Sequence, residues 1–291
     1  MQLRKKMNSG EFLVFAEMEP PKGVDVSALV ASATRVRGKV NAFVVPEMSN
    51  AVMKMSSLGF SILLQGKGLE TVMQVCCRDR NRLALQADLL AAQALGVASV
   101  MAVTGEDPSY GDHHKARAVY DIDLIELLQA IQTLRSGKDM AGVELRGSPE
   151  FLVGSTINVG ASGGALDLEL EELDKKMAAG AEFFVTSPVF DLELFARFMK
   201  KVVERKTKII PHVLLLKSVG MARYIDRHLD QVHIPADLIN RIQKAPDRVR
   251  ECISIAAELV ATIKDAGYPG VYLSTLGWEE KLSDILAGAK L

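Results

Sequence analysis

Two carboxylates stand where an apolar segment stops. Residues 12–16 read FLVFA; Glu17 and Glu19 follow, with Pro20 and Pro21 directly after. The run predicts a fully buried strand, which must end at the prolines because proline cannot donate a ladder hydrogen bond. Strand side chains alternate with period two, so the two carboxyl groups share a face. Like charges there would raise the pKa of one carboxyl, which suits a general acid near neutral pH; the alternative is a strand-end Glu turned to solvent.

Buried elements must hold such an acid in place, and strand-like runs alternate with helical patterns along the whole chain. We expect eight strands, at residues 12–17, 42–46, 72–76, 99–104, 152–158, 183–186, 208–214 and 271–275. Amphipathic or Ala/Leu-rich segments lie between them, and the clearest helices span 81–95, 191–204 and 249–266. Asn81 and Asp191 are the expected N-caps, while Gly96 and Gly267 end the first and last of these helices.

This alternation favours one fold class. About eight strand–helix units in 291 residues is the count for a (β/α)₈ TIM barrel. A doubly wound open sheet is the runner-up, but no GxGxxG motif follows the first strand. No linker, low-complexity stretch or repeat divides the chain, so we expect a single domain over residues 1–291. The long irregular segment 105–119 follows the fourth strand and would lie over the carboxyl-terminal mouth of the barrel.

Composition excludes several classes of protein. A hydrophobic fraction of 48% with 24% charged residues is typical of a globular protein with a large core. A net charge of −1, without a basic stripe, gives no general attraction to nucleic acid or anionic membranes. No apolar run is long enough to span a membrane, and the first residues lack the apolar core of a signal peptide, so we expect a cytoplasmic protein.

The cysteines limit the redox chemistry of the chain. Cys76, Cys77 and Cys252 are the three cysteines, too few for a zinc or iron–sulfur quartet, so we expect no metal site. Cys76 and Cys77 are adjacent at a strand end, and we expect them to be buried thiols. If the protein performs redox chemistry, its electron carrier must be an organic cofactor or belong to a partner.

In a barrel, the residues at the carboxyl ends of the strands converge however distant they are in sequence. The expected set is polar and comprises Glu17, Pro46, Gln74, Thr104, Gly105, Glu106, Asn158, Ser187 and Thr275. Two carboxylates among hydroxyl and amide groups indicate a site for an uncharged or amide-rich ligand. The set by itself does not name a reaction.

The charged residues next to this set could bind a ligand or have a structural role. Arg78 and Arg80 could clamp a phosphate or carboxylate, but an Arg–Asp brace of the loop is slightly favoured. Asp121 or Asp123 is the expected cap of the helix that follows.

Two further features have both a structural and a functional interpretation. His113 and His114 are adjacent in the long loop and are better read as solvated than as metal ligands. Trp278 is either a core residue or a plate for stacking a planar ring.

These segments together resemble the methylenetetrahydrofolate reductase family, particularly the form found in acetogens and related anaerobes. The matching motifs are AEMEPPKG at 16–23, AVMKMSS at 51–57, CRDRNR at 77–82, TGE at 104–106, GDH at 111–113, VYDID at 119–123, LKSVGMARY at 216–224 and GWE at 277–279. Their order and spacing along nearly the whole chain, rather than one motif, carry the resemblance.

The resemblance implies a flavin-bearing (β/α)₈ barrel that reduces 5,10-methylenetetrahydrofolate to 5-methyltetrahydrofolate. In that chemistry an acid helps to protonate the folate N10, the ring opens to a 5-iminium cation, and reduced flavin delivers hydride to the exposed methylene carbon. Glu17 matches the family's catalytic glutamate. Glu106 stands where most relatives carry an aspartate close to both flavin and pterin, so the resemblance gives it a catalytic and ligand-binding role.

The resemblance also implies which residues bind the cofactor and the substrate. The flavin, FAD or FMN, would be lined by Gln74, Thr104, Gly105, Glu106, Tyr120, Asp121, Asn158, Glu169 and Lys176. The folate side would include Glu106, Ser187, Met221 and Trp278. It departs from the best-known enzymes, because Ser187 and Met221 replace glutamines and 277–278 replaces an arginine.

Electrons would come either from a small partner protein with zinc and iron–sulfur centres, which we favour, or directly from NAD(P)H. We therefore expect an oligomer or a hetero-complex. Two other readings remain. The chain could be a flavin-bearing electron-relay subunit that does not turn over folate, or a colourless barrel that transfers a folate methyl group to a corrinoid.

Overall fold

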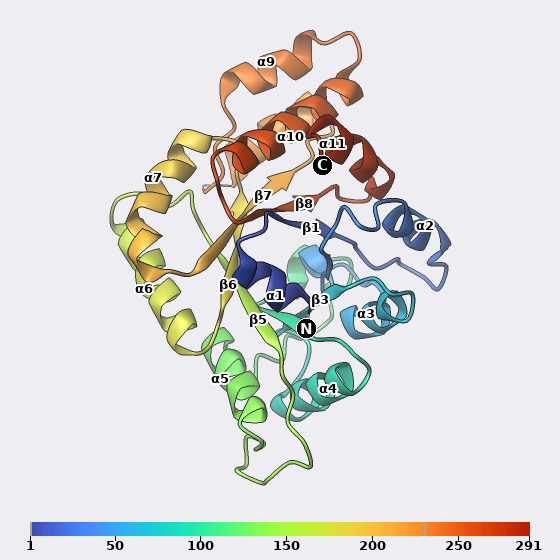
Figure 1. The fold of residues 1–291 in the computed structure, drawn as a ribbon, viewed down its shortest axis with the longest axis vertical. Coiled ribbons are helices and arrows are strands. Elements are labelled where there is room, and N and C mark those ends of the chain that lie inside the picture. The colour runs from blue at the N-terminus through green and yellow to red at the C-terminus, as the bar shows by residue number, and fades with distance from the viewer. Residues whose placement is uncertain (1, 230) are drawn as a thin grey trace.

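A computed structural model describes residues 2–229 and 231–291, and its centre is a closed barrel of eight parallel strands (Figure 1). Each strand pairs with the next along the chain, and the last pairs with the first. The strands are β1 (Leu13–Glu17), β2 (Ala42–Val45), β3 (Thr71–Cys76), β4 (Ser99–Val103), β5 (Leu152–Ile157), β6 (Phe183–Pro188), β7 (Lys208–Leu214) and β8 (Gly270–Ser274). The predicted (β/α)₈ barrel is confirmed, and every expected strand is present to within two residues at each end.

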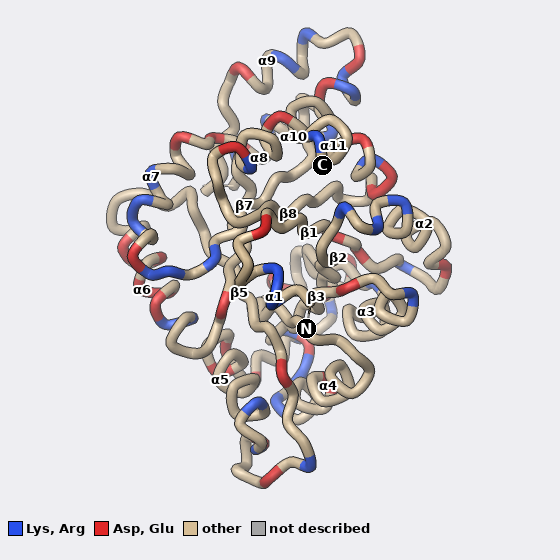
Figure 2. Tube along the Cα trace, viewed as in Figure 1, with Lys and Arg blue, Asp and Glu red and all other residues tan. Residues whose placement is uncertain are grey.

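Helices surround the barrel on the outside (Figure 1). They are α2 (Ser27–Arg35), α3 (Ser57–Gln65), α4 (Arg82–Ala94), α5 (Leu124–Arg135), α6 (Gly164–Ala178), α7 (Leu192–Val202), α8 (Val219–His228), α9 (Ala236–Lys244), α10 (Arg248–Asp265) and α11 (Leu282–Gly288). Short 3₁₀ turns lie at η1 (Ser49–Ala51), η2 (Pro108–Tyr110), η3 (Val203–Arg205) and η4 (Glu279–Lys281). In the view of Figure 2, Lys and Arg are interspersed with Asp and Glu along this outer layer.

The helix starts follow the capping residues. Asn81 and Asp191 cap α4 and α7 with their side chains, as predicted. Asp123, not Asp121, caps α5, and Glu126 completes a capping box with it. The helix expected at 249–266 begins one residue earlier, because Asp247 accepts a hydrogen bond from the first turn.

The amino-terminal end of the barrel is closed by α1 (Gln2–Ser9), which lies across the strands in Figure 1. Leu3 and Met7 of α1 join the apolar side chains that fill the barrel interior, among them Phe15 and Phe183. The two phenyl rings pack with centroids 5.8 Å apart. A side chain at Gly154 would collide with the Phe183 ring, so a glycine is needed there for the layer to close.

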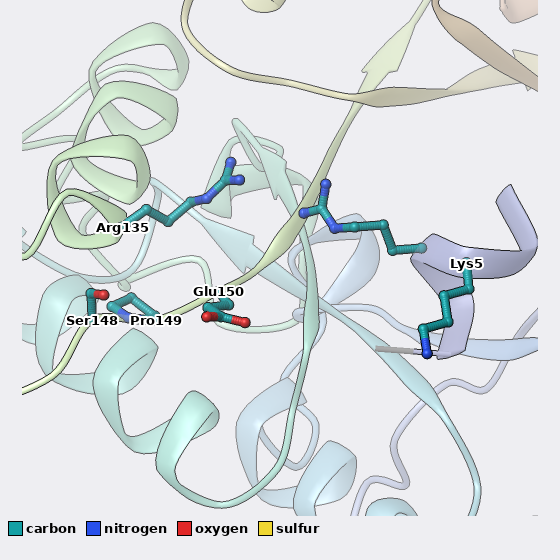
Figure 3. Close-up of a pocket in the computed structure, with 6 residues that line it drawn as sticks. Lys5, Arg135, Ser148, Pro149 and Glu150 are labelled. Carbon is teal, nitrogen blue, oxygen red and sulfur yellow. The ribbon is translucent and has the colours of Figure 1, made fainter. Parts of the chain in front are cut away.

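A hollow of about 510 Å³ lies at this same end and contains Arg4, Lys5 and Arg135 (Figure 3). It is not the candidate site, since ligands of such barrels bind at the carboxyl ends of the strands. The guanidinium groups of Arg4 and Arg135 also both bind the single carboxylate of Glu182, so part of their positive charge is already compensated.

Three further observations bear on the sequence predictions. No helix among the described residues is long and apolar enough to cross a membrane. Within the same residues, no three His, Cys, Asp or Glu side chains form a group that could hold a metal ion. Cys76 and Cys77 are buried free thiols, as expected, Cys252 is a buried free thiol as well, and burial raises the pKa of each.

Candidate active site

Glu17 is the last residue of β1, at the carboxyl-terminal mouth of the barrel. It lies on the inward face with Leu13 and Phe15, and its side chain is half-buried. The Tyr272 hydroxyl donates a hydrogen bond to Glu17 Oε2. The carboxyl group is therefore held inside the mouth and is not turned to bulk water.

Burial raises the pKa of Glu17 to about 7, and the hydrogen bond from Tyr272 partly opposes this. The negative charges of Glu19 and Glu279 raise the pKa further, while Lys54 lowers it. The charge of Glu19 raises the pKa of Glu17, as predicted from the sequence. Desolvation is nevertheless the larger effect, and Glu19 is itself paired with Lys54 at 2.5 Å.

Sequence reasoning missed the partners of Glu17 on the neighbouring strands. Tyr272 and Ser274 are inward residues of β8, and His212 is the inward residue beside Tyr272 on β7. The His212 and Tyr272 rings pack with centroids 4.6 Å apart, and His212 Nε2 lies 2.5 Å from Ser274 Oγ. The available signal was a polar residue at inward positions of otherwise apolar strands, His212 on β7 and Tyr272 and Ser274 on β8.

The opposite side of the mouth contains two cavities that meet at Thr104. The first cavity, of about 340 Å³, is lined by Gln74, Thr104, Gly105 and Glu106 together with Glu47 and Arg78. The second cavity, of about 580 Å³, is lined by Thr104, Tyr120 and Lys176. The structure thus brings six of the predicted flavin residues to two adjoining hollows.

Gly105 shapes the wall of the first cavity. Its φ of +88° is in the left-handed region that side chains rarely adopt. A Cβ built there would lie 2.2 Å from Cys76 Sγ and 3.0 Å from Arg78 Cβ. The loop after β4 can therefore pass close to the end of β3 because residue 105 has no side chain.

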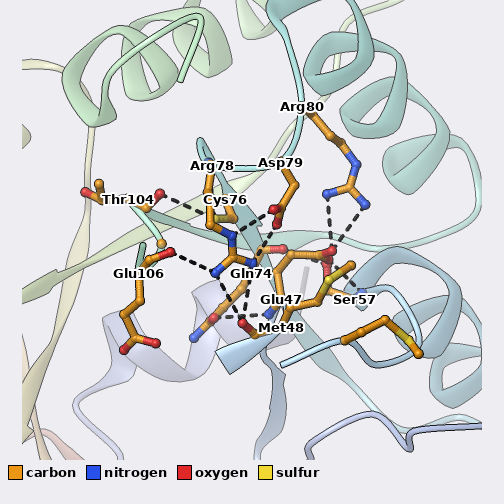
Figure 4. A network of polar contacts seen from close by, with 12 residues as sticks. Glu47, Met48, Ser57, Gln74, Cys76, Arg78, Asp79, Arg80, Thr104 and Glu106 are labelled. Carbon is orange, nitrogen blue, oxygen red and sulfur yellow. Dashed lines mark hydrogen bonds and ion pairs between the residues drawn. The ribbon is translucent and has the colours of Figure 1, made fainter. Parts of the chain in front are cut away.

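A polar network supports this wall (Figure 4). The buried Arg78 side chain binds both carboxylate oxygens of Asp79 at 2.7 Å and donates to the Glu106 carbonyl at 3.2 Å. Arg80 donates to the buried carboxylate of Glu47 at 3.2 Å. The favoured reading of the two arginines as a loop brace agrees with these contacts. In Figure 4 the Glu106 carboxylate points away from the network.

Three predicted residues form a cluster at the ends of β5 and β6. Glu169 Oε1 accepts a hydrogen bond from the backbone N–H of Asn158 at 2.9 Å, and Ser187 Oγ donates to Asn158 Oδ1 at 3.2 Å. Lys176 Nζ donates to the Thr156 carbonyl at 3.0 Å, next to this cluster. Burial lowers the pKa of Lys176, while the charge of Glu169 opposes that shift.

Three predicted residues lie apart from the cavities. Asp121 is on the outer rim, where it forms an ion pair with Arg82 at 2.9 Å. Met221 and Trp278 pack against the apolar cluster that includes residues of β1, β7 and β8. Lys217 Nζ lies 5.0 Å from the centroid of the Trp278 ring.

The long loop 105–119, which follows β4, is tied to the segments that follow β1 and β2 by Asp112. The Asp112 carboxylate forms an ion pair with Lys22 after β1 and accepts a hydrogen bond from the Met53 amide at 3.0 Å. His113 Nδ1 lies 2.8 Å from the same carboxylate and is otherwise exposed, as is His114. Loops after three strands are thereby joined above the site.

Comparisons with known proteins agree with this architecture. The chain matches the family model described as methylenetetrahydrofolate reductase over residues 2–290. Methylenetetrahydrofolate reductase 2 of Schizosaccharomyces pombe is 22% identical over 98% of this chain and 46% of that protein. A Caenorhabditis elegans protein named a probable methylenetetrahydrofolate reductase (NADPH) is 24% identical over 83% of this chain and 35% of that protein. The chain spans less than half the length of these curated relatives.

A solved structure shares the fold. It is an uncharacterized protein from Clostridium thermocellum that is described as binding two copies of 5-methyl-5,6,7,8-tetrahydrofolic acid. It superposes with a TM-score of 0.63 over 99% of this chain and 98% of its own, at 14% identity. Because the family model covers residues 2–290, this chain belongs to the methylenetetrahydrofolate reductase family.

Proposed function

We propose that this chain catalyses the flavin-dependent reduction of 5,10-methylenetetrahydrofolate to 5-methyltetrahydrofolate. The observation that carries the proposal is a carboxyl group at the barrel mouth, Glu17, with a pKa of about 7. At pH 7 roughly half of such groups carry a proton, against less than about 1% for an ordinary glutamate. Family membership and the named activities of the relatives support the choice of reaction, and the folate described in the Clostridium protein supports the choice of substrate.

The side chains around Thr104 fit a flavin, FAD or FMN. A flavin ring presents carbonyl oxygens and ring nitrogens at one edge, which call for amide, hydroxyl and cationic groups. Gln74, Tyr120 and Lys176 supply such groups around the two cavities, and Gly105 lets the backbone come close to a planar ring. Asn158 and Glu169 would complete the polar edge, whereas Asp121 would act from the rim.

Glu17 would donate its proton to N10 of the bound folate as the bond between N10 and the methylene carbon breaks. The substrate is then a 5-iminium cation, and Glu17 is a carboxylate that accepts the hydrogen bond from Tyr272. A reduced flavin, when bound, supplies the two electrons and the hydrogen that convert the iminium carbon to a methyl group. The Glu106 carboxylate, exposed beside the first cavity, would stabilise the positive charge of the iminium.

The electron donor to the flavin would be NAD(P)H or a partner protein with zinc and iron–sulfur centres. The name of the worm relative includes NADPH, which supports the first route. The second route needs the clusters to reside in the partner, since this chain has three cysteines and all are buried. A hetero-complex or an oligomer accordingly remains part of the proposal.

The substitution Glu17→Gln tests the proposed acid. We expect the flavin-loaded variant to keep its yellow colour and to lose roughly 10²–10⁴-fold in the rate at which methylenetetrahydrofolate reoxidises the reduced flavin. Glu11→Gln is the matched control, because Glu11 is exposed just before β1. Reoxidation of the Glu17 variant at the wild-type rate would remove Glu17 from the mechanism.

An electron-relay function without folate turnover is the second candidate. It is favoured by one observation: the Ser187 hydroxyl already binds Asn158, while Met221 and Trp278 pack in an apolar cluster. Titration of the purified protein with folate separates the two functions. Loss of all folate affinity in a flavin-loaded sample supports the relay, and a colourless preparation that transfers a folate methyl group supports the corrinoid methyltransferase.

A further inference from the structure

The hydrogen bond from Tyr272 makes the two carboxyl oxygens of Glu17 inequivalent, because only Oε2 accepts it. Tyr272 donates to Oε2, and it does so across the junction of β8 with β1, which closes the barrel. Residue 272 is paired in register with Phe15, two positions before Glu17 and on the same inward face. The contact is therefore set by the closure of the sheet and not by a loop.

Tyr272 can only donate in this contact near neutral pH. Burial, together with the negative charge of Glu17, raises the pKa of the Tyr272 hydroxyl well above its usual value. The Glu17 carboxyl has a pKa of about 7, so it is by far the stronger acid of the pair. A proton delivered to substrate near neutral pH must come from Glu17, and the tyrosine keeps its own.

The Tyr272 ring is held on its other side by His212. The two rings pack at 4.6 Å, and Ser274 Oγ lies 2.5 Å from His212 Nε2. Burial lowers the pKa of His212 to about 3, so the imidazole stays neutral and adds no charge beside the acid. The three side chains lie on two adjacent rigid strands, which fixes the direction of the tyrosine hydroxyl.

We propose that Tyr272 is a positioning residue for the acid: it occupies Oε2 of Glu17 and leaves Oε1 to carry the proton to the substrate. This inference rests on the proposed function of Glu17. In the step, the bond from Oε1 to hydrogen breaks as the bond from hydrogen to N10 forms. The charge left on the carboxylate is stabilised by the hydrogen bond that already exists at Oε2.

The other groups that act on Glu17 come from three segments. Glu19 and Glu279 raise its pKa, and Lys54 lowers it. Glu279 is buried and accepts a hydrogen bond from the Gly277 amide at 3.0 Å, so it is held in place independently of Tyr272. Removal of the tyrosine hydroxyl therefore changes one contribution and leaves these charges where they are.

The test is Tyr272→Phe in the full chain, with Tyr268→Phe as the control. Tyr268 is another partly buried tyrosine, and its ring packs on Phe195 away from the acid. Carbon-13 NMR of labelled glutamate carboxyl groups, assigned with Glu17→Gln, follows the titration of Glu17 directly. We expect the proton affinity of Glu17 to rise roughly tenfold in Tyr272→Phe and to stay unchanged in Tyr268→Phe.

Kinetics supply the second readout. In Tyr272→Phe the loss of folate reduction at high pH should move to higher pH, while the low-pH plateau of kcat falls roughly tenfold because the acid is no longer oriented. KM for folate should stay within about twofold, since Tyr272 need not touch the substrate. Ser274→Ala removes the contact of Ser274 Oγ with His212 Nε2. It should change the Glu17 titration and the kinetics in the same direction as Tyr272→Phe, by a smaller factor.

An unchanged Glu17 titration in a folded Tyr272→Phe protein would overturn the inference. A higher KM for folate with an unchanged pH profile would overturn the inference as well, because the tyrosine would then contact the substrate and not position the acid. The NMR titration needs neither flavin nor turnover, so it still decides the role of Tyr272 if Glu17→Gln shows that the proposed reaction is wrong. Thermal unfolding of both phenylalanine variants confirms that they are folded.

Discussion

The two ends of this barrel are built from the same strands but differ in what those strands place inside. At the amino-terminal end the inward residues are apolar, and Leu3 of α1 packs beneath Phe15 and Phe183. At the carboxyl-terminal end the inward residues include Glu17 and His212, and burial shifts the pKa of both against their charged forms. Apolar packing at the amino-terminal end stabilises the fold, whereas burial at the carboxyl-terminal end changes the pKa of the polar groups.

The difference has a physical origin in the period of two along each strand. Phe15 and Glu17 occupy successive inward positions of β1, about 7 Å apart along the strand. The phenyl ring gains free energy by leaving water, whereas the carboxylate loses hydration that one hydrogen bond only partly replaces. Reactivity at the mouth therefore costs stability that the closed end supplies.

The largest expected effect is at the closed end. Leu3→Ala should lower the free energy of unfolding by about 2–5 kcal/mol, because Leu3 is fully buried under the barrel and its loss leaves a cavity. Urea unfolding measures this, with the exposed Leu83 on α4 changed to Ala as the control. Equal losses in both variants would mean that α1 does not close the barrel as described.

Gly105→Ala should lower the free energy of unfolding by about 2–3 kcal/mol. The added side chain would be strained at a positive φ and would also collide with Cys76 Sγ. Gly163→Ala is the matched control, since Gly163 also has a positive φ, of 55°, but no atom within 4 Å of its added Cβ. Flavin retention after gel filtration and the free energy of unfolding are the measurements. If both variants kept flavin equally, the wall at Gly105 would not be part of the flavin site.

Glu17→Gln should raise the free energy of unfolding, whereas Leu3→Ala and Gly105→Ala lower it. The pKa of Glu17 is raised on folding from 4.5 to about 7, so the stability that wild type has below pH 4.5 is lost as the pH rises through 7. Allowing for partial solvent exposure, the variant should gain about 1–2 kcal/mol at pH 8 and nothing near pH 4.5. Chemical denaturation at several pH values checks this.

The control for that comparison lies in the same molecule. His212, with a pKa lowered to about 3, makes both proteins lose stability as the pH falls from 6.5, so its contribution cancels between them. A stability difference that did not depend on pH would contradict the raised pKa of Glu17.

The smallest effect is expected at the surface. Lys22→Ala breaks an exposed ion pair with Asp112 and should change the free energy of unfolding by less than about 1 kcal/mol. It should nevertheless increase hydrogen exchange in the loop 105–119, because one of the contacts that tie the loops together is lost. Lys175→Ala, which removes an exposed ion pair with Glu172 on α6, should leave that loop unchanged.

Much of the architecture could be predicted from local sequence, and so could one half of the candidate site. Caps such as Asn81 and Asp191 satisfy backbone groups within their own helix, so their position in the sequence is enough. Gln74 and Thr104 follow from the rule that strand ends converge, and they do line one cavity. Between Asp121 and Asp123 the sequence could not choose, because Arg82 on another helix binds the first.

The sequence by itself determined the alternation of strands and helices and a carboxylate at the end of β1, since each depends on residues near one another in the chain. The barrel followed from the number of strand–helix units. Tertiary structure alone decided the surroundings of that carboxylate. Its hydrogen-bond donor, Tyr272, is 255 residues away in the sequence, and its burial depends on the closure of β8 against β1. A pKa responds to everything within a few ångströms, so no single segment of the chain could specify it.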